Sequence, residues 1–323
     1  MDAETSQKPT SRSIEGYLSR WILHNAGDPR VSIRLWNGDE YSVTPDRPVA
    51  CMELRERRAL FELVRAPSVG FGECYSKGLI EIHGDFLEFI NEVTAALTRR
   101  NESSYYRPKI GSLVHALRSN SLARSRHNVH HHYDLGNEFY KLWLDERMVY
   151  TCAYYATPDA TLAQAQVAKL DHVCRKLGLQ PGQKVVEAGC GWGALALHMA
   201  ENYGVEVTAY NTSSEQIAFA REWAAARGLE GQVTFVQDDY RNIDQQCDVF
   251  VSVGMLEHVG VANFRRLGEV IKRCLRPEGH GLIHSIGRSH PRKADPWIVK
   301  HVFPGGHIPS LNEMMAVFEP QKF

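Results

Sequence analysis

From Leu177 onward, short apolar runs alternate with helical segments, and this alternation constrains the fold more than any other feature of the sequence. The runs that read as strands are Lys184–Glu187, Glu206–Tyr210, Val233–Gln237, Val249–Val253 and Gly281–Ile286. The segments that read as helices between them are Ala194–Tyr203, Glu215–Arg227 and Asn263–Leu275. Strands that alternate with helices form a parallel, doubly wound sheet. We therefore predict an α/β domain over residues 171–323.

The first third of the chain follows a different pattern. A helix is expected over Ile14–Ala26, followed by a hairpin of Val31–Trp36 and Tyr41–Val43 around the turn residues 37–39. Two more helices are expected over Leu54–Val64 and Glu81–Arg99. We predict a small α+β domain over residues 1–105 and a helical connector over residues 106–170.

The connector begins in a basic stretch. Seven basic residues and one acid, Glu102, lie between Arg99 and Arg126. Such a run is usually a solvated surface. The alternative is a patch for anionic headgroups, worth about 1 kcal/mol per charge near such a surface.

Composition limits the class of protein. The 323 residues carry a net charge of −1, which gives no overall field that would attract nucleic acid. The seven cysteines are scattered without a C-x-x-C pair, as in reduced cytosolic proteins. The polar N-terminus is no signal peptide, and no apolar run approaches the roughly 20 residues that span a bilayer. We expect a cytoplasmic protein that at most sits on the inner membrane face.

A glycine-rich turn follows the first strand of the predicted sheet. The strand carries Glu187 and leads into Gly189-Cys190-Gly191-Trp192-Gly193 before the next helix. Glycines there let the backbone approach a ligand without intervening Cβ atoms. Nucleotide-binding folds share G-x-G-x-G, so the motif alone is weak, and a tight turn without a ligand is the alternative.

Two more polar loops follow the next strands and strengthen the prediction. Asn211–Gln216 caps a helix where such folds hold ribose hydroxyls, and Asp239–Arg241 offers an acid and an aromatic ring to an adenine. A dinucleotide site would more often read G-x-G-x-x-G, but Gly193 comes one residue early, so S-adenosylmethionine is favoured over NAD. The expected pocket residues are Glu187, Gly189, Cys190, Gly191, Trp192, Gly193, Asn211, Thr212, Ser213, Ser214, Glu215, Gln216, Asp239, Tyr240 and Arg241.

Six blocks of the chain resemble the cyclopropane-fatty-acyl-phospholipid synthases and the related mycolic-acid methyltransferases. The blocks are the glycine turn, residues 132–140, 150–154, 252–260 and 284–287, and the run 303–306 with Pro309 and Ser310. Their order and approximate spacing match over about residues 60–323. The resemblance implies a class I S-adenosylmethionine methyltransferase fold and adds Tyr150 and Thr151 to the cofactor pocket.

The resemblance also implies a reaction. A methyl group would pass from S-adenosylmethionine to the double bond of an unsaturated phospholipid acyl chain, and a cyclopropane ring would close through a carbocation. Tyr133, Tyr154 and Tyr155 are candidates to stabilise that cation. A bound bicarbonate would take the proton, cradled by Cys152, Glu257, His284 and the backbone at Ile286. Related enzymes leave a methyl or methylene branch instead of a ring, and a homodimer is expected from the family.

Structural roles remain open for each of these residues. Glu257 can belong to a helix start, His284 can be a satisfied strand-end histidine, and Cys152 can fill the core. His127 and the run 130–132 suggest a metal, but no cysteine or carboxylate cluster accompanies them, and we expect none.

The chain ends at Phe323, before the last two strands that the family's sheet contains. The expected fold is therefore a Rossmann-like doubly wound sheet without its C-terminal strands, and Gly281–Ile286 would lie at its edge. Three explanations compete: a fragment of a longer product, a partner chain that supplies the strands, or an inactive paralogue that binds cofactor or lipid.

Overall fold

A computed structural model describes residues 13–102 and 136–321. They fall into two compact units, one within Met1–Ser112 together with Asp295–Trp297, the other made of Leu113–Ala294 and Ile298–Phe323. The predicted first boundary, at residue 105, lies outside the described residues. The predicted end of the connector, at residue 170, falls within one continuous helix of the second unit, α8 (Leu162–Leu177). Residues 107–126 of the basic stretch, the histidine run and Tyr133 lie outside the described residues.

The first unit is a four-stranded sheet covered by helices. Its elements are α1 (Ile14–Asn25), β1 (Val31–Arg34), β2 (Glu40–Tyr41), β3 (Ala50–Leu54), α2 (Arg57–Arg65), α3 (Pro67–Ser76), β4 (Ile80–Gly84) and α4 (Phe86–Glu102). The strand order is β2-β1-β3-β4, with β1 parallel to β3 and the other pairs antiparallel. The predicted hairpin is confirmed as β1 and β2. The segment Glu81–Arg99 was wrongly predicted as all helix, because Ile80–Gly84 pairs with β3.

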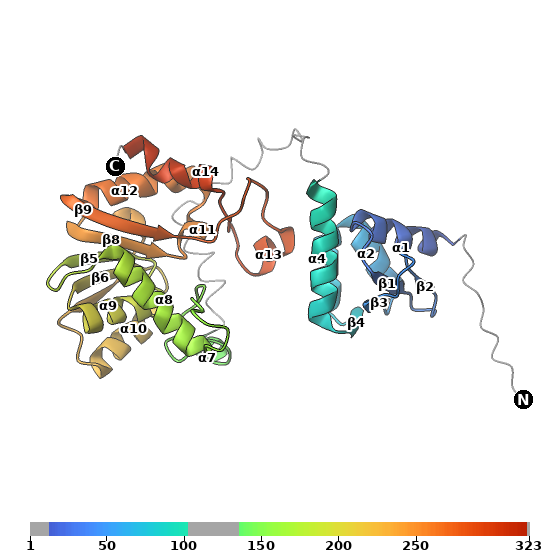
Figure 1. Cartoon of the computed structure of the whole chain (residues 1–323), viewed down its shortest axis with the longest axis horizontal. Helices are drawn as coiled ribbons and strands as arrows, with labels where there is room; N and C mark the ends of the chain where they lie inside the picture. Colours follow the sequence, from blue (N-terminus) through green and yellow to red (C-terminus); the bar gives the residue numbers. More distant parts are fainter. Residues whose placement is uncertain (1–12, 103–135, 322–323) are drawn as a thin grey trace, which may run out of the picture. The chain divides into compact units, whose positions relative to one another are not determined.

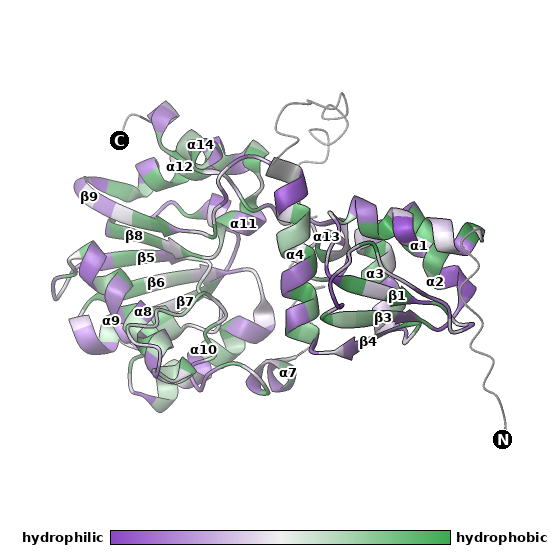
Figure 2. Ribbon diagram, turned by 45° about the vertical axis from the view of Figure 1, so that its right-hand side comes forward, coloured by the Kyte–Doolittle hydropathy of each residue, from purple (hydrophilic) through white to green (hydrophobic). Residues whose placement is uncertain are grey.

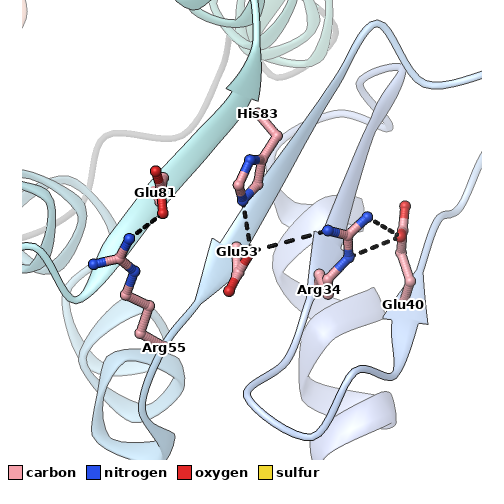
Figure 3. Close-up of polar contacts among 6 residues, drawn as sticks. All are labelled: Arg34, Glu40, Glu53, Arg55, Glu81 and His83. Atoms are coloured by element: carbon pink, nitrogen blue, oxygen red, sulfur yellow. Dashed lines mark hydrogen bonds and ion pairs between the residues drawn. The ribbon is translucent and has the colours of Figure 1, made fainter.

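The two faces of this sheet differ in character, as period-two strands require. Ile33, Met52 and Ile80 point into the core formed with the helices. On the other face, charged side chains connect neighbouring strands (Figure 3). The Arg34 guanidinium lies 3.0 Å from the Glu40 carboxylate and 3.9 Å from that of Glu53. Glu53 Oε2 in turn accepts a 2.5 Å hydrogen bond from His83 Nε2, and Arg55 pairs with Glu81. This face is therefore a solvated surface stabilised by cross-strand pairs.

The second unit is the predicted doubly wound α/β domain. Its main elements are α7 (Asn137–Lys141), α8, β5 (Lys184–Ala188), α9 (Ala194–Tyr203), β6 (Glu206–Asn211), α10 (Ser214–Ala226), β7 (Val233–Gln237), β8 (Cys247–Val253), α11 (Leu256–Val259), α12 (Phe264–Cys274), β9 (Leu275–His284) and α14 (Leu311–Met314). Short 3-10 turns are η1 (Tyr240–Asn242), η2 (Val261–Asn263), η3 (Met315–Val317) and η4 (Glu319–Gln321). The helix α13 (Pro296–His301) contains residues grouped with both units.

All five strands of this sheet are parallel, in the order β7-β6-β5-β8-β9. The strands β5 and β8 consist mainly of hydrophobic residues (Figure 2). One core lies between the sheet and α8, α9 and α10, and a second lies between the sheet and α12, on the opposite face (Figure 1). In the described residues β9 is the last strand on its side, as predicted. The direction of strand addition reverses between β5 and β8, so the carboxyl ends of these strands mark the expected ligand site.

Among the described residues, none of the helices combines the length and the apolar character that a bilayer span requires.

Candidate functional site

The glycine turn between β5 and α9 has the predicted form. Gly189 and Gly193 have φ of +84° and +91°, and a Cβ would come within 2.9 Å of Met255 at the first and 2.7 Å of the Phe235 ring at the second. Both positions therefore need glycine for packing as well as for backbone conformation. Gly191 differs, because its φ is +54° while a Cβ there would meet no atom within 4 Å. The turn thus presents open space at Gly191, which a ligand can occupy.

The loop after β6 is tied to this turn through Asn211. Its Nδ2 donates to the Gly191 carbonyl at 3.1 Å and to Gln216 Oε1 at 2.8 Å, while its Oδ1 accepts from Thr212 N at 2.7 Å. Ser213 caps α10 by accepting from Gln216 N. Ser214 and Glu215 are exposed at the helix start. Two of the predicted loops therefore meet, with Asn211 as the link.

In the loop after β7, the polar groups of Asp239 and Arg241 interact with each other. Asp239 is buried, accepts from Arg241 N at 3.0 Å, and lies 3.1 Å from Arg241 Nε. The Tyr240 ring belongs to the core between the sheet and α12, and burial raises the pKa of Tyr240 to about 12. The predicted stacking of an adenine on this residue stays a prediction, and the placement of the ring gives it no support.

An aromatic cluster packs against the glycine turn from α7 and the segment after it. Tyr140 lies 4.9 Å from Trp192 and 5.6 Å from Tyr150 between ring centroids, and Trp192 Nε1 donates to Asn137 Oδ1 at 2.7 Å. The predicted pocket residues Tyr150 and Trp192 are therefore brought together. Cys190 is buried, and burial raises the pKa of its thiol well above the ordinary range, so it is not a reactive thiolate.

A second polar cluster lies at the carboxyl ends of β8 and β9. Gly254 N donates to the carbonyl of His284 at 3.0 Å, which ties the two strand ends together. Ile286 N donates to Glu257 Oε1 at 2.7 Å. The backbone at Ile286 was expected to form part of an anion cradle, and this stays a prediction. In the structure its N–H is bonded to Glu257, and so it positions that carboxylate.

Two atoms of this cluster lack a protein partner. Within residues 13–102 and 136–321, Glu257 Oε2 and His284 Nδ1 are buried and make no hydrogen bond. Burial lowers the pKa of His284, with Lys169 and Lys176 adding to the shift and Glu257 opposing it, so the imidazole is neutral at pH 7. Buried polar atoms without partners are costly, and here they point to a small polar ligand.

The remaining predicted catalytic residue is Cys152. It is exposed, and in the described part of the chain no hydrogen bond joins it to Glu257 or His284. Tyr154 stacks on His172 of α8, with centroids 4.8 Å apart, and Tyr155 is exposed. No group of three metal-ligating side chains occurs among the described residues.

Sequence reasoning missed a set of buried polar residues beneath the segment 149–152. Asp145, Gln166 and Lys169 are each less than a tenth exposed. Gln166 and Lys169 share one face of α8 with Leu170 and Val173, which are core residues. The sequence could have revealed this set, because it places a glutamine and a lysine at core positions of a helix.

Comparison with known proteins agrees with this geometry. Residues 120–323 match the family model described as mycolic acid cyclopropane synthetase, and residues 19–107 match one described as a domain of unknown function. A probable fatty acid methyltransferase of Pseudomonas putida is 35% identical over 88% of this chain and 73% of its own length. The cyclopropane-fatty-acyl-phospholipid synthase of Escherichia coli K12 is 39% identical over 78% of this chain, which spans 65% of that relative.

Two solved methyltransferase structures are also similar to this chain. A mycolic acid cyclopropane synthase complexed with S-adenosylhomocysteine has a TM-score of 0.58 and 32% identity, over 61% of this chain and 74% of that one. A coclaurine N-methyltransferase, also bound to S-adenosylhomocysteine, has a TM-score of 0.57 and 25% identity, over 72% of each chain.

Proposed function

Because the chain belongs to the mycolic acid cyclopropane synthetase family of S-adenosylmethionine-dependent methyltransferases, we propose that it methylates the double bond of unsaturated phospholipid acyl chains to form a cyclopropane ring. The observation that carries the proposal is that two candidate sites lie at the carboxyl ends of strands of the same parallel sheet. An open glycine turn ends β5, and the unpartnered Glu257 and His284 atoms lie at the ends of β8 and β9.

The residues at the glycine turn fit the cofactor. Gly191 leaves room for it, and Glu187 Oε2 and Gln216 Nε2 are buried without a hydrogen-bond partner in the described part of the chain. Asn211 fixes the turn against the next loop. When bound, S-adenosylmethionine supplies an electrophilic methyl group.

The second cluster fits a small oxyacid anion, and bicarbonate as the base is part of our proposal. Glu257 Oε2 can accept from its O–H, and His284 can donate to it in the tautomer that carries the proton on Nδ1. Ile286 N holds Glu257 in position. Bound there, bicarbonate supplies a proton acceptor for the carbocation that the proposal places on the acyl chain.

A second candidate product is a methyl or methylene branch. It is favoured by the relatives from Pseudomonas putida and Mycobacterium tuberculosis, the second a tuberculostearic acid methyltransferase that is 32% identical over 77% of this chain. In both cases the substrate is a membrane lipid, so we propose that the protein works at the cytoplasmic face of a membrane. We also propose that it is a homodimer, as expected from the family.

The direct test uses methyl-labelled S-adenosylmethionine and vesicles of dioleoyl phospholipid. We expect label in the lipid fraction and none with vesicles of the saturated counterpart. Proton NMR of the product separates a cyclopropane ring, which gives upfield ring protons, from an exocyclic methylene, which gives olefinic protons. A folded sample that binds S-adenosylhomocysteine but labels no lipid would favour an inactive cofactor-binding paralogue.

The open position in the glycine turn gives a prediction for cofactor binding. Gly191→Ala places a methyl group in the space left for the ligand, and we expect the dissociation constant for S-adenosylhomocysteine to rise about tenfold or more, measured by calorimetry. The matched control is Gly178→Ala at the end of α8, where φ is +57° and a Cβ also meets nothing within 4 Å. Both changes carry a backbone cost of about 1–2 kcal/mol. Equal affinities in the two variants would contradict the assignment.

A further inference from the structure

Lys169 is a buried lysine at the centre of the second unit, and the chemistry described so far does not use it. It lies on α8 and is 7% exposed. Lysines are almost never this buried without a partner, since removing an ammonium group from water is costly. Its surroundings therefore need an account.

The geometry ties Lys169 to the segment that crosses the sheet edge. Its Nζ donates to Thr151 Oγ1 at 2.8 Å. One turn earlier on α8, Gln166 Nε2 donates to the carbonyls of Thr151 at 2.9 Å and Val149 at 3.3 Å. The methyl group of Thr151 fills the space that a Cβ on Gly254 would need, at the end of β8. Side chains of α8 thus hold this segment at three points against the strand ends.

The charges around Lys169 come from several elements. Glu187 faces it from β5 and Asp145 from the turn before Val149, and the thiols of Cys152 and Cys174 also lie within electrostatic reach. The positive charge of Lys169 also contributes to the lowered pKa of His284 in β9. The Asp145 carboxylate already accepts from Val149 N at 2.9 Å and Arg147 N at 3.2 Å, whereas Glu187 Oε2 has no hydrogen-bond partner among the described residues.

Lys169 and Glu187 depend on each other for their charges. Burial lowers the pKa of Lys169 to about 8 and raises the pKa of Glu187 to about 8, and each charge opposes the shift of the other. Glu187 immediately precedes the strand end that leads into the glycine turn. Loss of the ammonium group therefore favours a neutral Glu187 under that turn.

We propose that Lys169 is a positioning residue for the cofactor site, because it pins the Tyr150–Cys152 segment through Thr151 against the end of β8. The inference rests on the proposed function in that the cofactor is S-adenosylmethionine. It adds a residue that acts through Thr151, one of the residues expected in the cofactor pocket.

The test is calorimetric titration with S-adenosylhomocysteine at pH 7.5 for the wild type, Lys169→Met, Lys169→Arg and Thr151→Val. Lys169→Met removes the donor to Thr151 Oγ1 and should bind at least tenfold more weakly than the wild type.

The remaining variants test the tether itself. Lys169→Arg keeps a hydrogen-bond donor at this position and should restore most of the affinity that Lys169→Met loses. Thr151→Val keeps the shape against Gly254 but removes the hydroxyl, so affinity should fall severalfold. This variant also decides the question if Lys169→Met does not fold. A folded Lys169→Met protein or a Thr151→Val protein with wild-type affinity would overturn the inference. A folded wild type that binds no S-adenosylhomocysteine would contradict the proposed function itself.

Discussion

Glu257→Gln should lower the rate of methyl transfer into unsaturated lipid by about a hundredfold or more, while the dissociation constant for S-adenosylhomocysteine stays within about twofold. The substitution keeps an oxygen that can accept from Ile286 N, so the local fold is preserved. It replaces the unpartnered Oε2, an acceptor, by an amide that can only donate. The bicarbonate that removes the proton therefore loses the carboxylate that orients it, while the glycine turn is unaffected.

The matched control for this variant is Glu269→Gln on α12. Glu269 is half-exposed, and its carboxylate lies 3.6 Å from the Arg266 guanidinium on the same helix. It is not part of the candidate site, so turnover should be unchanged. Turnover is measured with labelled donor and dioleoyl phospholipid vesicles at saturating cofactor. Wild-type turnover by Glu257→Gln would remove the carboxylate from the mechanism and leave His284 as its remaining protein component.

The doubly wound unit could be predicted from sequence because its signals are local. Ala194–Tyr203 has the predicted bounds in the structure, and each of the five predicted strands is present. The first unit was less predictable. In this unit Ile80–Gly84 becomes a strand only through pairing with Ala50–Leu54, a contact that no local periodicity reveals.

The same distinction holds for the candidate site. The glycine turn carries its own motif, and Glu257 and His284 were found through resemblance to a family. Their link through Ile286 N depends on how two strand ends meet, so the sequence could not supply it. Lys169 was missed because a lysine on a helix normally faces water, and only the packing of α8 against β9 and α9 shows that this one does not.

The burial of Lys169 and Glu187 predicts an unusual pH dependence of stability. Glu187 has a pKa raised to about 8 in the folded state, so the native protein binds the extra proton and the free energy of unfolding falls as pH rises from about 4.5 to 8. Lys169 has a pKa lowered to about 8, so the unfolded chain binds the extra proton and stability recovers between about 8 and 10.5. The pair therefore contributes a stability minimum near pH 8.

The double variant Lys169→Met/Glu187→Gln should abolish that minimum and raise the free energy of unfolding near pH 8 by about 1–4 kcal/mol, measured by urea denaturation against the wild type. Two buried ionisable groups are replaced by neutral ones of similar size, so the desolvation cost of their charged forms disappears. The exposed pair gives the matched control: Glu138→Gln/Lys141→Met should change stability by less than about 1 kcal/mol at every pH. The stabilised protein should bind S-adenosylhomocysteine at least tenfold more weakly, because the hydrogen bond from Lys169 to Thr151 is gone. A double variant that is less stable than the wild type at pH 8 would show that the two charges stabilise the fold by more than their burial costs.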